Sequence, residues 1–132
     1  MYAKYVVNVE KEDGYRVSSP FDRTIKHIFA PDVRGVQELT FSQVTIPAEG
    51  KTDAHTHDRG ELIFVTSGWG QVSMEDEVYE LESDFAMWIP KGVKHALKST
   101  RSEALKIVTV FVPAYEAADM ESIILKRTDL TS

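Results

Sequence analysis

The chain contains 132 residues, of which 42% are hydrophobic and 10% aromatic, so it is too rich in apolar residues for a disordered chain and can form a packed core. Its 15 Lys and Arg are outnumbered by 21 Asp and Glu, for a formal net charge of −6. This charge argues against nucleic acids and anionic membranes as partners, because both bind basic surfaces. The sequence has no cysteine, which excludes disulfides, thiolate nucleophiles, iron–sulfur clusters and cysteine-rich zinc sites.

No stretch of the sequence reaches the ~20 apolar residues that a membrane-spanning helix needs. The N-terminus carries a short apolar run without the longer apolar core of a signal peptide. We therefore expect a cytoplasmic protein with no membrane partner.

The distribution of apolar and turn-forming residues predicts an all-β fold. Short runs rich in Val, Ile, Thr, Phe and Tyr are separated by Gly, Pro and Asp at close intervals. These runs predict strands at Lys4–Val9, Arg23–Phe29, Val36–Ile46, Asp53–His57, Glu61–Thr66, Gly70–Met74, Val78–Leu81, Phe85–Ile89, His95–Ser99 and Leu105–Val112. One short helix is predicted at Ala114–Ser122. Many short strands without intervening helices indicate an antiparallel sandwich or barrel, here as a single domain over residues 1–132.

Two segments predict a second subunit. The strand Glu61–Thr66 is apolar without interruption from residue 62 to 65, so both of its faces should be covered, either by curling of the sheet into a barrel or by another chain. The N-terminal segment alternates apolar and polar residues and would form an exposed edge unless it is paired. We therefore expect a homodimer, with Trp69, Phe85 and Trp88 in the core or in subunit contacts.

The sequence contains four histidines, and two of them form the pattern His55-Thr56-His57. Residues i and i+2 of a strand point to the same face, so both imidazoles should project together. The following residues 58–60 form a turn, and this turn would return Glu61 beside the pair. Two imidazoles and one carboxylate suit a divalent metal ion of borderline softness.

A third imidazole is available further along the chain. Pro90 and Gly92 form a turn, and His95 stands at the head of the strand that follows. If this strand lies across a barrel from the histidine pair, His95 would complete a site of three imidazoles and one carboxylate. A six-coordinate ion in such a site would keep two positions open for water or substrate.

These residues resemble the two sequence motifs of the cupin family. The pattern Gly50-x4-His55-x-His57-x3-Glu61-x6-Gly68 resembles the first motif, at residues 50–68, and Asp84-x5-Pro90-x-Gly92-x2-His95-x3-Ser99 resembles the second, at residues 84–99. Asp84 and Ser99 stand where the family usually has Gly and often Asn. The resemblance implies a small single-domain cupin with a double-stranded β-helix (jelly-roll) barrel. It also implies that His55, His57, Glu61 and His95 bind one divalent transition metal ion, which could be Fe, Mn, Ni, Co, Cu or Zn.

Other polar residues have simpler interpretations. His27 is interpreted as a hydrogen-bonded or partly exposed strand residue, and Arg59 as a solvated cation of the turn. Asp53 either accepts a hydrogen bond from an imidazole or is a solvated loop carboxylate. Gln43 and Thr45 share one strand face that could line a pocket or face water.

Two functions are compatible with such a site. The first is a metal-dependent enzyme that acts on a small oxygenated metabolite, bound through a carboxylate, keto or enol oxygen, with the ion as Lewis acid or with dioxygen as co-substrate. The site would carry one net positive charge, which favours an anionic substrate. The second is a non-catalytic module that binds or senses a small ligand through the same ion. The short chain leaves no room for the DNA-binding domain of regulatory cupins, which favours the enzyme. The sequence names no catalytic residue.

Overall fold

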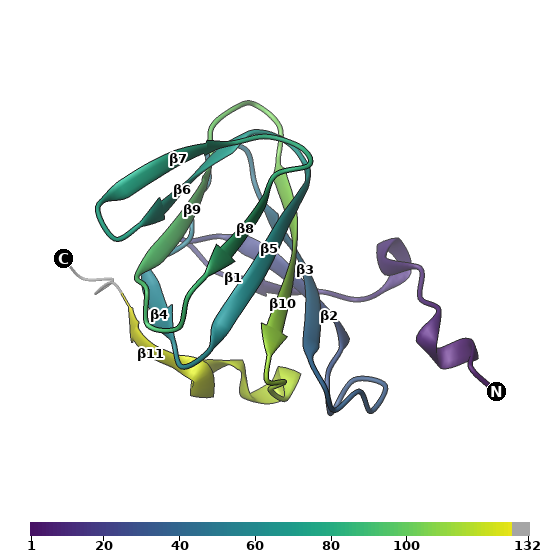
Figure 1. The fold of residues 1–132 in the computed structure, drawn as a ribbon. Helices are drawn as coiled ribbons and strands as arrows, with labels where there is room; N and C mark the ends of the chain where they lie inside the picture. The colour runs from purple at the N-terminus through teal and green to yellow at the C-terminus, as the bar shows by residue number, and fades with distance from the viewer. Residues whose placement is uncertain (128–132) are drawn as a thin grey trace.

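The computed structural model describes residues 1–127, whose strands form two antiparallel sheets that face each other (Figure 1). One sheet has the order β1-β2-β3-β10-β5-β8 and the other the order β11-β4-β9-β6-β7. The strands are β1 (Tyr15–Val17), β2 (Arg23–Phe29), β3 (Thr40–Ile46), β4 (His55–His57), β5 (Gly60–Ser67), β6 (Gly70–Met74), β7 (Glu77–Leu81), β8 (Ala86–Ile89), β9 (His95–Ser99), β10 (Leu105–Val112) and β11 (Ile124–Arg127). The all-β jelly-roll fold predicted from the sequence is confirmed.

The buried side chains of paired strands align in rows across the barrel interior. Along β3 and β10 every second residue is buried, as the period of a half-buried strand requires. The registers Ile46–Leu105 and Val44–Ile107 belong to the aliphatic core, whereas the next row, Ser42–Thr109, is polar. The core therefore fills one end of the barrel, and the polar row marks the beginning of a cavity towards the other end.

The N-terminal prediction was wrong. The segment Lys4–Val9 is not a strand; two short 3-10 helices, η1 (Ala3–Tyr5) and η2 (Val9–Lys11), occupy this region outside the two sheets (Figure 1), and η2 is hydrogen-bonded to β2 through the Lys26 side chain. The main-chain N–H groups of this segment bond locally within the turns, and the Asn8 side chain caps η2 by accepting from the Glu10 N–H. The alternating sequence favoured a strand, but the segment pairs with neither sheet.

Other elements begin or end at different residues than the sequence predicted. The strand predicted at Val36–Ile46 begins only at Thr40, because residues Arg34 and Gly35 have positive φ values of 64° and 69° and turn the chain back, so that the Val36 N–H donates to the Ala30 carbonyl. Strands β1 and β11 were not predicted. The short C-terminal helix is confirmed as the 3-10 helix η3 (Ala117–Ile123), later than the predicted Ala114–Ser122.

The outer face of β5 is apolar and open. Ile63 and Val65 are fully buried in the core, but Leu62 and Phe64 point outward and are 42% and 37% exposed. Trp88 lies beside Leu62 on β8 and is 54% exposed, so it is not a core residue. Within this chain the barrel covers one face of the run, not both.

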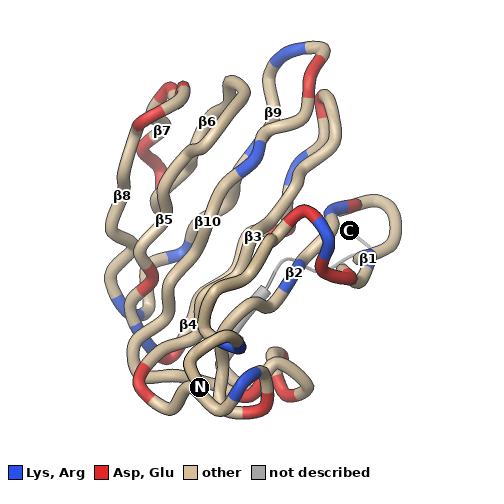
Figure 2. The backbone as a smooth tube through the Cα atoms, turned by 90° about the vertical axis from the view of Figure 1, so that its right-hand side faces the viewer, with Lys and Arg blue, Asp and Glu red and all other residues tan. Residues whose placement is uncertain are grey.

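Charged side chains concentrate in the loops, while long uncharged stretches follow β5 and β10 (Figure 2). No helix within residues 1–127 is long and apolar enough to cross a membrane. The single domain expected over residues 1–132 stays a prediction, and residues 128–132 lie outside the described part of the chain.

Candidate metal centre

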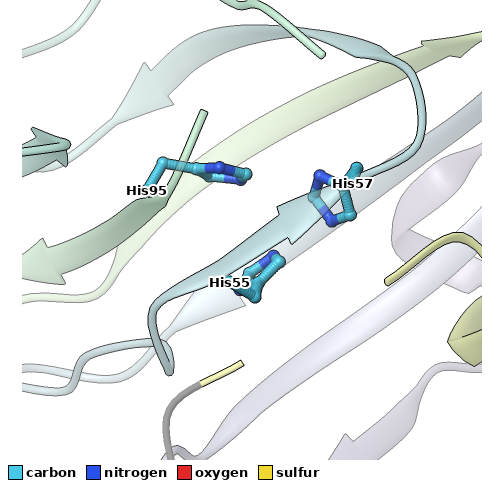
Figure 3. A group of neighbouring side chains, drawn as sticks. All are labelled: His55, His57 and His95. Atoms are coloured by element: carbon cyan, nitrogen blue, oxygen red, sulfur yellow. The ribbon is translucent and has the colours of Figure 1, made fainter. Parts of the chain in front are cut away.

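Three of the four histidines meet at the wall of the cavity. His55 and His57 project together from β4, and His95 comes from β9, where it is the register partner of His55. Their ring centroids are 4.5, 4.6 and 4.9 Å apart, and one ligand atom of each lies within 4.8 Å of those of the others. Figure 3 shows the three rings turned towards one another. These three buried imidazoles could coordinate a metal ion.

Main-chain oxygens orient two of the rings. The Nδ1 of His55 lies 2.8 Å from the carbonyl oxygen of Asp53, and the Nδ1 of His95 lies 2.9 Å from that of Val93. A carbonyl oxygen only accepts, so each Nδ1 must carry the proton and donate. In the neutral rings Nε2 is then the nitrogen with the lone pair, which is the form that a metal ligand requires.

The turn before β5 brings Glu61 to the histidines. Arg59 fixes this turn by bonding to the Asp58 carboxylate and by donating to the carbonyl oxygens of Pro113 and Ala114 at 2.9 and 2.7 Å. Arg59 is therefore mostly buried against the chain and is not the solvated cation that the sequence suggested. Asp58 is held further by its N–H, which donates to the Ile123 carbonyl.

The Glu61 carboxylate contacts two of the three rings. Its Oε1 lies 3.2 Å from His95 Nε2 and 3.6 Å from His57 Nδ1. The group whose ligand atoms all lie within 4.8 Å of one another comprises the three histidines, and Glu61 is beside this group. Its Oε1 is buried and forms no hydrogen bond of normal geometry with a described residue. A buried carboxylate without such a bond is costly unless a cation compensates it.

The spacing of these donors suits a shared cation. Ligand atoms about 2.1 Å from a common ion, at angles between octahedral and tetrahedral, lie roughly 3.0–3.4 Å from each other. The two distances from Glu61 Oε1 to the nitrogens of His95 and His57, 3.2 and 3.6 Å, are close to this range. These two contacts are near the spacing of ligands on one ion, whereas the ligand atoms of the three histidines lie within 4.8 Å of one another.

Burial and charge set opposite protonation preferences within the cluster. Burial, and to a smaller extent the neighbouring His95, lower the pKa of His55 to about 4. Burial also acts to lower the pKa of His95, but the close contact with the Glu61 carboxylate and its negative charge outweigh burial, so this pKa is raised. In the absence of an ion, a proton bound to the cluster therefore prefers the side of His95 and Glu61.

The three imidazoles open into a cavity of about 80 Å³. A cavity that holds one water needs roughly 10–15 Å³, so the space suits several waters or a small metabolite. Most of its walls are aliphatic or aromatic, and Phe111 packs edge-on against His57 at 4.9 Å. Polar groups besides the cluster come from Arg23, Ser42, Thr52, Thr109 and Tyr115.

A buried ion pair supports the loop that leads to β4. The Arg23 Nη2 lies 3.3 Å from the Asp53 Oδ1, and both side chains are less than a tenth exposed. Asp53 therefore orients His55 through its main-chain oxygen while its carboxylate pairs with Arg23, so it is not a solvated loop residue. Gln43 and Thr45 alternate with the cavity-lining Ser42 and lie on the opposite face of β3.

Sequence reasoning did not identify Arg23 or Tyr115 as cavity residues. The sequence could have indicated Arg23 as a cavity residue, because residues 23, 25 and 27 share one face of a predicted strand. Tyr115 follows β10 in a loop whose path no local pattern indicates. His27 was interpreted as hydrogen-bonded, and its Nε2 lies 3.2 Å from the Tyr115 hydroxyl.

Comparison with known proteins agrees with the motif resemblance. The family model described as "Cupin domain" matches residues 42–111, a span that includes β4 and β9 with the three clustered histidines and also Glu61. The chain belongs to the cupin family. A relative of this cupin is an uncharacterised protein from Methanocaldococcus jannaschii, 25% identical over 99 residues, which are 74% of this chain and 78% of that protein.

Solved structures share the fold of this cupin at low sequence identity. A "predicted oxalate decarboxylase" from Thermotoga maritima superposes with a TM-score of 0.74 at 15% identity, covering 82% of this chain and 98% of that one. The polyketide cyclase RemF from Streptomyces resistomycificus has a TM-score of 0.75 at 16% identity, covering 95% and 84%. Because both identities are low, these structures establish the fold and leave the reaction open.

Proposed function

We propose that this cupin is a metal-dependent enzyme in which His55, His57, Glu61 and His95 hold one divalent transition metal ion. The observation that carries the proposal is the approach of Glu61 Oε1 to His95 Nε2 at 3.2 Å. Because His95 Nδ1 already donates to a carbonyl oxygen, two acceptor atoms face each other there. The two atoms repel each other unless a proton or a metal ion lies between them. The imidazoles of His55 and His57 can supply two further ligands.

The donor set selects a class of ion. Three imidazoles and one carboxylate accept Fe, Mn, Ni, Co, Cu or Zn, so the element follows from availability in the cell. When bound, such an ion supplies a Lewis acid for a substrate carboxylate, keto or enol oxygen, and iron additionally permits dioxygen chemistry.

The chain itself determines which substrates enter. The mostly aliphatic and aromatic walls and the size of the cavity limit the substrate to a small molecule. Three neutral imidazoles and the Glu61 carboxylate leave one net positive charge on a divalent site, and the Arg23–Asp53 pair adds none. A small anionic metabolite therefore matches the charge of the cavity, although the whole chain carries a net charge of −6.

Metal analysis tests this proposal. The protein is purified without added ions or a chelating tag, and its metal content is measured by mass spectrometry. We expect about one equivalent of a transition metal in the wild type and a strong loss in His57→Ala. The matched control is His27→Gln, which changes the histidine outside the cluster and should retain the ion. A His57→Ala variant with full metal content would refute the assignment.

Binding without turnover is the alternative function, because it would use the same ion and cavity. The two functions separate when metal-loaded protein is incubated with small hydroxy and oxo acids and the mixture is followed by NMR. Conversion of one acid with catalytic stoichiometry supports the enzyme, whereas stoichiometric binding of an unchanged acid supports the binding module.

We also propose that a second copy of the chain covers the outer face of β5 and β8, which we call the outer patch and define by Leu62, Phe64, Ala86 and Trp88. The register places Leu62 next to Trp88 and Phe64 next to Ala86, and the patch carries no charge. Copies with a net charge of −6 repel each other, so an uncharged apolar face is where two of them can meet. A cytoplasmic location remains a further proposal.

A further inference from the structure

One row of side chains inside the barrel is polar where the adjacent row is aliphatic. On the three neighbouring strands β2, β3 and β10 the register aligns His27 with Ser42 and Ser42 with Thr109. The adjacent row consists of Ile25, Val44 and Ile107 in the same order. Burying polar groups in an apolar interior costs free energy unless they form hydrogen bonds. Packing alone therefore does not explain why this row is polar.

Tyr115 is fixed above this row by its main chain and its ring. The Thr40 hydroxyl donates to the Tyr115 carbonyl and accepts from the Tyr115 N–H, both at 2.8 Å. The tyrosine ring packs against Phe111 at 5.3 Å, and Phe111 in turn packs against His57. The phenol is therefore held at a defined place in the cavity that contains the three histidines.

His27 holds the phenol of Tyr115 in place. Its Nε2 is 3.2 Å from the Tyr115 hydroxyl, and its other side is stacked on the Tyr15 ring at 5.9 Å with an angle of 8° between the rings. The Tyr15 hydroxyl donates to the sulfur of Met120 at 2.8 Å. The imidazole thus lies between two tyrosines, stacked on the ring of Tyr15 and in contact with the hydroxyl of Tyr115.

The His27–Tyr115 pair is neutral. Burial lowers the pKa of His27, and the nearby charge of Asp32 only partly opposes this. Burial raises the pKa of Tyr115, and the negative charge of Glu61 adds to the rise. A neutral phenol offers one proton and two lone pairs, and its contacts with His27 and Ser42 leave one of these three sites free.

The hydroxyl of Ser42 is a second polar group of the cavity. It is buried, lines the cavity, and has no hydrogen bond of normal geometry with any residue that the structure describes. Its contact with the Tyr115 phenol is a loose hydrogen bond that counteracts in part the rise of that pKa. Two neighbouring hydroxyls with spare hydrogen-bonding capacity therefore face the same cavity.

We propose that Tyr115 and Ser42 form a second anchoring point for the ligand, which binds an uncharged hydroxyl or carbonyl oxygen, and that His27 is a positioning residue for Tyr115. This inference rests on the proposed metal function, because the anionic end of the ligand meets the histidine cluster. The Glu61 charge disfavours a second anion near Tyr115, and the apolar walls between the two polar regions suit a short carbon chain. The ligand class is a small hydroxy or oxo carboxylic acid.

The test uses the full chain loaded with Co²⁺, whose absorption spectrum reports ligand binding. The probes are butyrate and 2-, 3- and 4-hydroxybutyrate, which differ only in the presence and position of one hydroxyl. We expect 3- or 4-hydroxybutyrate to bind about tenfold more tightly than butyrate, as one well-placed hydrogen bond allows. Tyr115→Phe and Ser42→Ala should each reduce this advantage several-fold without changing the Co²⁺ content or the affinity for butyrate.

The matched control is Tyr79→Phe, which removes the hydroxyl of an exposed tyrosine on β7 and should leave all affinities unchanged. For His27 we expect His27→Ala to lose part of the advantage and His27→Gln to restore it, because the glutamine amide reaches the phenol as Nε2 does. A purely structural role would not show this rescue. Equal advantages in the wild type and in Tyr115→Phe with Co²⁺ bound would overturn the inference alone. A wild type that binds no ion would overturn it together with the proposed function.

Discussion

His55 on β4 lies directly opposite His95 on β9 in the pairing of these two strands. Strand β4 is only three residues long, so its place in the sheet depends strongly on this neighbour and on β11. Glu61 reaches the same point from β5, which belongs to the other sheet. An ion held by all of them would therefore link the two sheets of the barrel.

The first prediction concerns metal removal. An ion that binds the folded chain alone stabilises it by RT ln(1 + [L]/Kd), about 4 kcal/mol at a free concentration one thousand times Kd. We expect chelator treatment of the loaded protein to lower Tm by on the order of 10 °C, measured by scanning calorimetry. His57→Ala should show one Tm with and without the chelator. Equal Tm values for the metal-loaded and the metal-free wild type would contradict the proposal that an ion links the two sheets.

The second prediction concerns Glu61→Gln. In the metal-free protein, at a pH above the raised pKa of His95, the amide can donate to the lone pair of His95 Nε2, so the repulsion between two acceptors disappears. We expect the free energy of unfolding to rise by about 1 kcal/mol in urea titrations of metal-free protein. Metal affinity should fall at least about tenfold in competition with a chelating dye. The exposed Glu82→Gln is the control, with neither effect; a variant that binds metal like the wild type would exclude Glu61 as a ligand.

The third prediction concerns pH. In the unfolded chain the imidazoles titrate near 6.5, whereas the folded pKa of His55 is about 4 and that of His27 is also lowered. Between these values the unfolded chain binds more protons, so stability falls as the pH falls from about 6.5 to 4. The raised pKa of His95 acts in a different window: its contribution is complete below 6.5 and is lost as the pH rises through the raised value.

Thermal unfolding of the metal-free protein at pH 6.5 and pH 5 measures this effect below the window of His95, and Tm should be lower at pH 5. The charges that face His55 are those of His95, Asp53 and Arg23, and they partly offset one another. His55→Asn keeps a donor for the Asp53 carbonyl but cannot titrate, so its Tm should fall less between the two pH values. An equal fall in both proteins would assign the pH dependence to other groups.

The fourth prediction concerns the outer patch. Sedimentation velocity at micromolar concentrations should show a dimer for the wild type and a monomer for Leu62→Lys and Trp88→Lys, because a buried unpaired ammonium is costly. The control is Val78→Lys, at a residue that is 60% exposed on the other sheet, and it should remain dimeric. A monomeric wild type, or dimers in all three variants, would remove the patch as the subunit contact.

The sequence by itself determined the features that depend on neighbours along the chain. The period of two places His55 and His57 on one face, and a short turn returns Glu61 to them, so spacing was sufficient to bring these groups together. The second motif placed His95 at the head of a strand in the same way. Most strand positions followed from local runs of β-branched and aromatic residues bounded by turn residues.

Only the tertiary structure decided which distant residues share the cavity. The hydrogen bond between His27 and Tyr115 joins residues 88 positions apart, and Thr40 fixes Tyr115 across 75. Such contacts depend on strand order and register, which no local pattern encodes. The failed strand at Lys4–Val9 has the same physical cause: alternation prepares a segment for a sheet, but a strand forms only where another strand supplies the partners for its N–H and C=O groups.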